Sequence, residues 1–171
     1  MHGIIIYQSK YGATRQYAEW ISQTLQVPAI EANKVTPAQL ATADFLILGT
    51  SIYIGKMLLR PWLQQHEGQL AGKPLYLFVV CATKPEEADK LNGYVAQNMP
   101  ALLLVHCHRY FLPGKIRFSD LSLADKLKVR AGSFMAKLTG QQFDVSDFNR
   151  LDPVLTSPLV QDIQQRYQVQ S

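Results

Sequence analysis

Five continuous apolar runs, rich in β-branched residues, recur along this chain and constrain its fold more than any other feature. Strands with one face in water alternate apolar and polar residues, so continuous runs predict strands that are buried on both faces. The runs occupy residues 3–8, 28–32, 44–50, 74–82 and 102–111. Segments with helical apolar spacing separate them, and this alternation predicts an α/β fold in which helices cover both faces of a parallel sheet.

The helical segments carry apolar residues three or four positions apart. They are predicted at residues 14–26, 59–70, 88–95, 122–138 and 158–167, with Ser122 as the cap of the fourth. Five strands joined by right-handed crossovers suit a doubly wound sheet with the strand order 2-1-3-4-5. Because the 171 residues contain no internal repeat or linker-like segment, we expect residues 1–171 to form a single domain.

In open sheets of this kind, ligands bind beyond the carboxyl ends of the strands, where the strand order reverses. The loops after strands one, three and four should therefore build the site, and the first reads Ser9-Lys10-Tyr11-Gly12-Ala13-Thr14. This loop runs directly into a helix, whose unpaired N–H groups and dipole attract anions. Ser9 and Thr14 add hydroxyl groups and Gly12 lets a ligand approach the backbone, so the loop predicts a phosphate site.

The stretch from Ile5 to Ile21, which contains this loop, resembles the flavin mononucleotide (FMN) signature of the flavodoxins. In that family the hydroxyl-bearing loop wraps the FMN phosphate. The resemblance implies a flavodoxin-like fold and a cofactor-binding role for Ser9, Lys10, Tyr11, Gly12, Ala13 and Thr14. A turn that merely caps the helix is the alternative for this loop.

The second loop, Gly49-Thr50-Ser51-Ile52-Tyr53-Ile54-Gly55-Lys56, is similar to the flavodoxin loop that contacts the isoalloxazine ring. The resemblance implies cofactor contacts for Thr50, Ser51, Ile52, Tyr53 and Gly55. Tyr53 is the expected stacking ring, because a flat flavin packs well on an aromatic face, although it could instead pack on the neighbouring helix.

The same segment nearly spells a nucleotide-binding P-loop. Its glycines are one residue too far apart, and Met57 replaces the Ser or Thr that would bind magnesium, so we do not expect NTP hydrolysis.

The third loop, Ala82-Thr83-Lys84-Pro85-Glu86, should lie at the other edge of the flavin. The resemblance implies that Ala82, Thr83 and Lys84 bind the cofactor, with Thr83 and backbone amides hydrogen-bonding the ring. Lys84 could equally be a solvated lysine.

A second family resembles the chain more closely, namely the flavodoxin-type, menaquinone-dependent protoporphyrinogen oxidases. They combine the same FMN loop with three elements found here as Gly49-Thr50-Ser51-Ile52, Lys84-Pro85-Glu86 and a basic helix that ends in a Met-Lys/Gly-type run, Phe134–Gly140. The resemblance implies an FMN-dependent dehydrogenase of porphyrin biosynthesis that oxidises protoporphyrinogen IX and reduces a quinone. No residue resembles a dedicated general base, and none is needed if the flavin N5 accepts hydride.

The cysteines and their neighbouring histidines suggest no chemistry. Cys81 and Cys107 sit inside apolar runs and are expected to be buried, reduced thiols. In a strand, His106 and His108 would point to one face and Cys107 to the other, so these three side chains cannot close on one metal ion.

The formal net charge is +4, and the whole of it is found locally between residues 115 and 137. This basic stretch has two acids, Asp120 and Asp125, and six cations: Lys115, Arg117, Lys126, Lys128, Arg130 and Lys137. Such a charge attracts anions, which indicates a propionate-bearing tetrapyrrole or an acidic membrane surface as partner. A solvated helix face is the alternative, and the interspersed Leu123, Leu127, Phe134 and Leu138 could face either a partner or the core.

The chain begins with an apolar strand, and its longest apolar run, Leu75–Ala82, is far short of the ~20 residues that span a bilayer. We therefore expect a cytoplasmic protein, with peripheral contact at the inner face of the membrane as an option. No nucleic-acid partner is expected, and the oligomeric state stays open.

Three hypotheses compete for the function. The first is an FMN-dependent oxidoreductase acting on a tetrapyrrole or a quinone. The second is a flavodoxin electron-transfer carrier, although electron-carrying flavodoxins are typically acidic and this chain is basic. The third is a flavin-free interaction domain on the same fold.

Overall fold

The computed structural model describes residues 2–53, 55–82, 87–127 and 147–167. Its main sheet contains five parallel strands in the order β2-β1-β3-β5-β6. The strands are β1 (Gly3–Tyr7), β2 (Ala29–Glu31), β3 (Phe45–Tyr53), β5 (Leu75–Cys81) and β6 (Cys107–Pro113). A sixth strand, β4 (Lys56–Met57), pairs antiparallel with the end of β3. The predicted doubly wound order 2-1-3-4-5 is confirmed.

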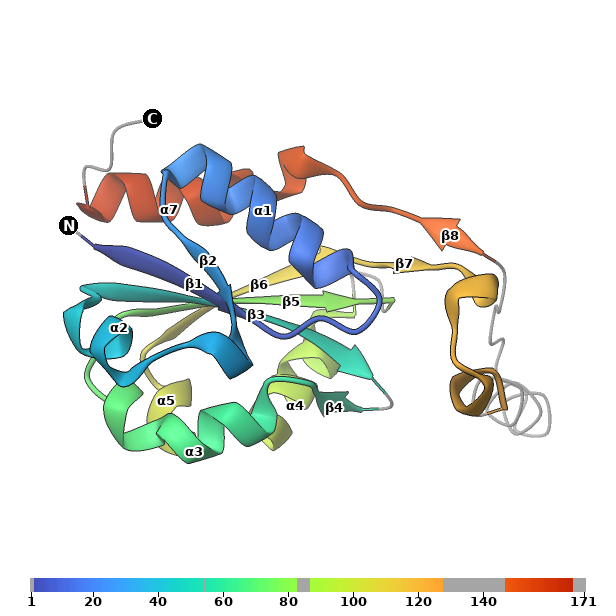
Figure 1. Cartoon of the computed structure of the whole chain (residues 1–171), viewed down its shortest axis with the longest axis horizontal. Coiled ribbons are helices and arrows are strands. Elements are labelled where there is room, and N and C mark those ends of the chain that lie inside the picture. The colour runs from blue at the N-terminus through green and yellow to red at the C-terminus, as the bar shows by residue number, and fades with distance from the viewer. Residues whose placement is uncertain (1, 54, 83–86, 128–146, 168–171) are drawn as a thin grey trace. The chain divides into compact units, whose positions relative to one another are not determined.

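Helices cover both faces of this sheet (Figure 1). One face packs against α1 (Ala13–Leu25) and α7 (Ser157–Tyr167). The other packs against α2 (Pro37–Thr42), α3 (Arg60–Leu70), α4 (Ala88–Asn98) and α5 (Ala101–Leu104). The central strands are buried along both faces, which is why their sequences read as continuous apolar runs.

Local sequence signals set several helix ends. Thr36 caps α2 in a capping box with Gln39, and Pro37 occupies the first helical position. Helix α1 ends where Gln26 adopts a left-handed conformation with φ 54°. Short 3-10 turns, η1 (Ala32–Lys34) and η3 (Pro153–Thr156), complete the connections in this part of the chain.

Two predicted strand boundaries are wrong. The fifth apolar run predicts strand from residue 102, but Ala101–Leu104 forms α5 and strand β6 begins only at Cys107. An apolar run alone does not separate a buried helical turn from a strand, and Pro100 starts this turn. Strand β3 also continues past residue 50 to Tyr53, because it pairs with β4 in a hairpin.

The chain divides into two compact units. The first contains Met1–Gly114 and Leu151–Ser171, and therefore the whole main sheet. The second, Lys115–Arg150, contains strands β7 (Lys115–Ile116) and β8 (Phe148–Asn149), which pair antiparallel, and the 3-10 turn η2 (Phe118–Asp120). This division does not test the expectation that residues 1–171 form a single domain, which stays a prediction.

Within the second unit, residues 123–127 are helical and the Ser122 hydroxyl accepts a hydrogen bond from the Asp125 N–H at 3.2 Å. Ser122 thus caps the helix as expected. The rest of the predicted helix, up to residue 138, lies outside the described residues. None of the helices in the described part of the chain has the length and apolarity that crossing a membrane needs.

Candidate functional site

The carboxyl ends of β1, β3 and β5 meet at one edge of the sheet, because these strands are parallel and in register. Tyr7 pairs with Gly49, and Ser51 pairs with Val80. Strand β2 lies on one side of β1 in the sheet, and β3, β5 and β6 lie on its other side. The strand order therefore reverses between β1 and β3. All three predicted loops begin at this edge.

The first loop is shaped by Gly12, which has φ 81° and caps the start of α1. This left-handed conformation favours glycine over any residue with a Cβ. The Gly12 N–H donates to the Ser9 hydroxyl at 3.1 Å, and the Gln16 N–H donates to the Gly12 carbonyl at 3.0 Å. A hydroxyl that accepts one hydrogen bond can still donate another, so this geometry is compatible with donation from Ser9 to a ligand.

The start of α1 suits an anion. Its N-cap residue, Gly12, has no side chain to cap it, and its first turn contains no acidic residue. The first N–H groups of a helix have no partner within the helix, so those of α1 point to this loop at the positive end of the helix dipole. Thr14 is buried in the first turn, whereas Ser9, Tyr11 and Ala13 are half-buried and Lys10 is exposed.

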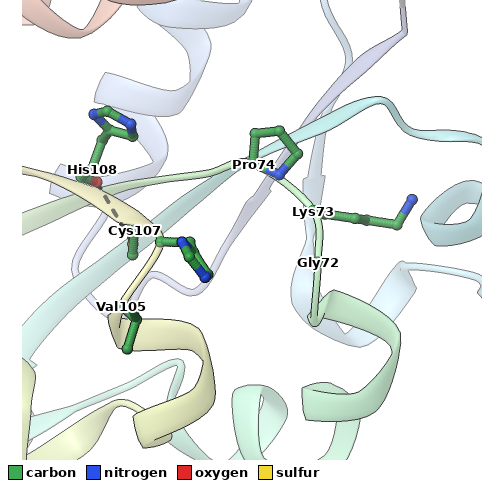
Figure 2. Close-up of a pocket in the computed structure, with 7 residues that line it drawn as sticks. Gly72, Lys73, Pro74, Val105, Cys107 and His108 are labelled. Atoms are coloured by element: carbon green, nitrogen blue, oxygen red, sulfur yellow. Dashed lines mark hydrogen bonds between the residues drawn. The ribbon is translucent and has the colours of Figure 1, made fainter.

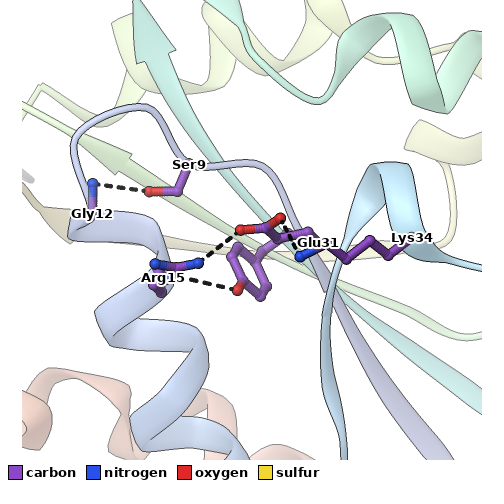
Figure 3. Close-up of polar contacts among 6 residues, drawn as sticks. Ser9, Gly12, Arg15, Glu31 and Lys34 are labelled. Carbon is purple, nitrogen blue, oxygen red and sulfur yellow. Dashed lines mark hydrogen bonds and ion pairs between the residues drawn. The ribbon is translucent and has the colours of Figure 1, made fainter.

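A polar cluster beside the first loop escaped sequence reasoning (Figure 3). Arg15 donates to Glu31 at 2.9 Å and to the Tyr7 hydroxyl at 3.4 Å, and Lys34 lies 3.1 Å from the other Glu31 oxygen. The hydrogen bond and charge of Lys34, with a smaller contribution from Arg15, lower the pKa of Glu31. A cation in the first turn of a helix is unfavourable because it lies at the positive end of the helix dipole. The ion pair with Glu31 offsets this effect for Arg15.

The second loop is a hairpin rather than an open loop. Ile52 pairs with Met57 and Tyr53 with Lys56, and Gly55 makes the turn with φ 70°. The predicted residues Thr50, Ser51, Ile52 and Tyr53 are therefore strand residues, of which Thr50 is fully buried.

Thr50 holds the chain that follows the hairpin. Its hydroxyl accepts from the Leu59 N–H at 3.1 Å, and the neighbouring Ser51 carbonyl accepts from the Leu58 N–H at 3.1 Å. A backbone-bracing role for Thr50 is thus visible, whereas its expected cofactor contact stays a prediction.

One contact joins the first two loops. The Lys10 ammonium lies 4.2 Å from the centre of the Tyr53 ring and 5.5 Å from that of Tyr11, which is cation–π geometry. Tyr53 is half-buried, so its ring is not simply packed into the core. Residues from the ends of β1 and β3 that the sequence singled out separately therefore lie together.

The third loop is described only at its start. Ala82 is exposed directly after β5, and the Cys81 carbonyl accepts from the Gly114 N–H at 2.9 Å, which ties the ends of β5 and β6 together. Thr83 and Lys84 lie outside the described residues, as does the Lys84-Pro85-Glu86 motif.

The glycine at position 49, which gives this segment its similarity to a P-loop, is explained by core packing. Gly49 lies inside β3, and a Cβ there would come within 2.3 Å of the Phe78 ring. This glycine makes room for a core aromatic side chain, and the segment that follows it is strand, so it does not wrap a phosphate.

A pocket of about 550 Å³ lies at the opposite edge, before β5 and β6 begin (Figure 2). Its lining includes Lys73, His106, Cys107 and His108. Lys73 donates to the Ala43 carbonyl at 2.7 Å, and burial raises the pKa of the Cys107 thiol to about 12, so neither offers free chemistry. Among the described residues, no three His, Cys, Asp or Glu side chains gather to hold a metal ion.

His108 instead belongs to a cluster that holds α7 on β6. We call His108, Tyr110, Asp162 and Arg166 the β6–α7 cluster. Asp162 accepts from Tyr110 at 2.6 Å and from Arg166 at 2.7 Å, and its carboxylate lies 3.2 Å from His108 Nδ1. Burial opposes ionisation of Asp162, but these hydrogen bonds and charges outweigh it and lower its pKa. Both cysteines are buried and unbonded to each other, as predicted.

Comparison with known proteins adds a family match. A family model described as a flavodoxin domain matches residues 4–146. A search of curated proteins finds no match.

Solved structures similar to the chain include three flavodoxins. One from the domain Archaea is 21% identical, with 82% of this chain and 100% of that chain covered and a TM-score of 0.43. One from Streptococcus pneumonia TIGR4 is 16% identical, covers 80% and 99%, and has a TM-score of 0.47. Oxidised Flavodoxin 2 from Bacillus cereus is 20% identical, covers 80% and 99%, and has a TM-score of 0.45. Since these scores are low, the family assignment rests on the family model.

Proposed function

This chain belongs to the flavodoxin domain family, and from that premise we propose that it is an FMN-dependent oxidoreductase of the kind that oxidises protoporphyrinogen with a quinone as acceptor. Family membership implies FMN as the cofactor. The observation that carries the proposal is the first loop, where the left-handed Gly12, which has no side chain to cap the helix, opens α1.

The residues at this edge fit FMN. The first-turn amides of α1 and the hydroxyls of Ser9 and Thr14 would hold the phosphate, since phosphate prefers a helix N-terminus with hydrogen-bond donors and no acid. Tyr53 at the end of β3 offers an aromatic face for the ring. Lys10, beside that face, supplies a cation that would favour a negatively charged ring. Bound FMN would supply the redox chemistry: each step would remove a hydride and a proton from the substrate, and the two electrons and two protons would convert the quinone to a quinol.

Four features support the finer assignment to tetrapyrrole oxidation. The Gly49-Thr50-Ser51-Ile52 and Lys84-Pro85-Glu86 motifs and the Met-Lys/Gly-type run Phe134–Gly140, which follows the basic residues, resemble those of the protoporphyrinogen oxidases. The net positive charge suits a substrate with propionate groups.

Absorption spectroscopy of the purified protein, with chromatography of the released cofactor, tests FMN binding. Turnover of protoporphyrinogen in the presence of a menaquinone analogue then tests the reaction, and Thr14→Ala serves as the cofactor-poor control. A protein that carries FMN without oxidising protoporphyrinogen contradicts the finer assignment.

An electron-transfer carrier is the second candidate, because the family takes its name from such proteins. Potentiometry separates the two, since a cationic surface stabilises the anionic reduced flavin and brings the two one-electron potentials together. Widely separated potentials with a very low second one would favour the carrier. A protein that binds no flavin would favour the interaction domain instead.

We also propose that the basic stretch 115–137 docks on an anionic partner, either the tetrapyrrole propionates or an acidic membrane surface. Leu123 and Leu127, one helical turn apart, are 80% and 67% exposed, which favours a docking face over a core-facing stripe for these two residues. Four net charges would contribute roughly 1 kcal/mol each near an anionic bilayer. Lys128, Arg130, Phe134 and Lys137 of this stretch, and the adjacent Leu138, lie outside the described residues.

Co-sedimentation with anionic vesicles at low salt tests membrane docking. Replacing Lys126, Lys128 and Arg130 with Gln should release the protein, whereas replacing Lys34, Lys90 and Arg109 should not. Binding that survives the first triple substitution contradicts this docking face. If vesicles are not bound but the same substitution raises the KM for protoporphyrinogen, the partner is the tetrapyrrole.

A further inference from the structure

The hairpin formed by β3 and β4 is held from outside by one buried amide. Asn98, the last residue of α4, is only 4% exposed. Its Oδ1 accepts from the Met57 N–H at 3.1 Å, and its Nδ2 donates to the Gly55 carbonyl at 2.9 Å. One side chain therefore satisfies a donor and an acceptor two residues apart in the turn.

The same Nδ2 also donates to the Tyr94 carbonyl at 2.8 Å, one turn earlier in α4. This bond fixes the Asn98 side chain relative to its own helix. The orientation of the amide is unambiguous, since a backbone N–H can only donate and the two carbonyls can only accept. Both hydrogens and the oxygen of Asn98 are used, so the side chain is a rigid bridge between α4 and the hairpin.

No other side-chain type of this shape can make the bridge. Aspartate would keep the acceptor for Met57 but turn a carboxylate oxygen toward the Gly55 and Tyr94 carbonyls. Leucine or alanine would leave the turn's buried N–H and carbonyl without partners. Gln97, its neighbour in α4, is exposed and makes a matched control.

The hairpin matters because it carries Tyr53 and Gly55 to the cofactor edge. The Tyr53 ring lies 4.2 Å from the Lys10 ammonium of the first loop, so a shift of the turn would move this ring at the cofactor edge. Asn98 itself is 43 positions from Gly55 in the chain and lies on a helix of the opposite sheet face from α1.

We propose that Asn98 is a positioning residue, which sets the hairpin that contacts the flavin ring and leaves the phosphate loop unaffected. The inference rests on the proposed FMN site. It divides that site into two independently held halves: the first loop, held by β1 and α1, binds the phosphate, and the hairpin, held by α4, binds the ring.

Parallel titrations with FMN, riboflavin and inorganic phosphate test this division. Asn98→Ala and Asn98→Asp should weaken the binding of FMN and of riboflavin by the same factor, about tenfold or more. The concentration of inorganic phosphate that competes with FMN should stay the same. Thr14→Ala should weaken the binding of FMN but not that of riboflavin, which has no phosphate. Gln97→Ala should leave all three unchanged.

The acid dependence of Asn98→Asp gives a readout that a merely structural role would not move. A buried carboxyl protonates more readily and then donates one hydrogen bond, so the flavin affinity of Asn98→Asp should recover partly as the pH falls. Asn98→Ala should show no such recovery. If Asn98→Ala does not fold, Asn98→Asp, which has the same shape, carries the test.

Unchanged flavin affinity in folded Asn98 variants overturns the proposal, as does an equal loss for FMN, riboflavin and phosphate. These outcomes are distinct from failure of the proposed function, because in that case the wild-type protein itself would bind no flavin.

Discussion

The carboxyl edge of the main sheet and the β6–α7 cluster both gather polar side chains, but they use them in opposite ways. At the carboxyl edge, the N-cap of α1 is Gly12, which has no side chain to cap the helix. In the β6–α7 cluster, Asp162 is surrounded by Tyr110, Arg166 and His108, and the donors and the acceptor satisfy one another. The first arrangement is suited to a ligand and the second to holding a helix on a sheet.

The difference teaches where a sequence motif misleads. His106-Cys107-His108 is the more conspicuous string of reactive residue types, yet Cys107 is buried and His108 faces the carboxylate of α7. The loop Ser9–Thr14 contains few reactive groups, and its chemistry comes from backbone N–H groups and hydroxyls. Substitutions should therefore separate the two regions, with ligand affinity changing in one and the free energy of unfolding in the other.

The largest effect should come from the hydroxyls of the first loop. Ser9→Ala and Thr14→Ala should each weaken FMN binding by about 1 to 3 kcal/mol, because a phosphate oxygen loses a hydrogen bond. Fluorescence titration of FMN measures this loss. Thr24→Ala, at an exposed position on the same helix, should keep the wild-type affinity. Full affinity in both loop variants would place the phosphate elsewhere.

Gly12→Ala should lower the free energy of unfolding by about 1 to 2 kcal/mol, since alanine is strained at φ 81°. Urea denaturation of the flavin-free protein measures this change. A Cβ added at Gly68, inside α3, would meet no atom within 4 Å, so Gly68→Ala should be neutral or stabilising. A Gly12→Ala protein as stable as the wild type would mean that the loop takes another conformation without its ligand.

Asp162→Asn should lower the free energy of unfolding by about 1 kcal/mol, a modest value because the cluster is partly exposed to solvent. The FMN affinity should stay the same, which is the opposite pattern to that of Thr14→Ala. Urea denaturation and flavin titration of the same variant measure the two effects. A lower FMN affinity with an unchanged free energy of unfolding would mean that the β6–α7 cluster acts on ligand binding, which contradicts this prediction.

The Asp162 contribution should depend on pH in a defined direction. Its pKa in the folded protein is lowered, so the stabilisation is fully present above the unfolded value of about 3.9 and is lost as the pH falls through the folded value. The wild type and Asp162→Asn should therefore differ at neutral pH and converge in acid. A difference that grows below about pH 3.9 would contradict this assignment.

The smallest effect is expected at the thiols. Because burial raises the pKa of Cys107 to about 12, this thiol should react with iodoacetamide only on unfolding. Mass spectrometry of native and urea-treated protein checks this. Fast labelling of Cys107 in the native state would mean that β6 opens readily at its start.

The sequence predicted the sheet well because its central strands are buried on both faces, and burial leaves a continuous apolar signal. It failed at Ala101–Leu104, where the same signal comes from a helical turn that buries Leu103. The antiparallel pairing of β4 was also missed, because two residues are too few to show a period.

Local spacing predicted the turn at Gly12, but it could not single out Asn98. A glycine between hydroxyl residues before a helix is a local signal, which the backbone conformation of Gly12 explains. Asn98 acts on a turn 43 positions away, and a single amide at the end of a helix has no distinguishing pattern. Likewise, Arg15 and Glu31 meet only because β1 and β2 are neighbours.

The pairing of β7 with β8 has a consequence for how such a chain can evolve. Lys115 lies opposite Asn149 and Ile116 opposite Phe148, and partners in an antiparallel ladder are about 5 Å apart. The chain therefore enters and leaves the Lys115–Arg150 unit at two adjacent, paired segments. A two-residue turn could join these segments, so the unit can be gained, lost or exchanged as a cassette. Selection can then change this unit without rebuilding the carboxyl edge of the main sheet.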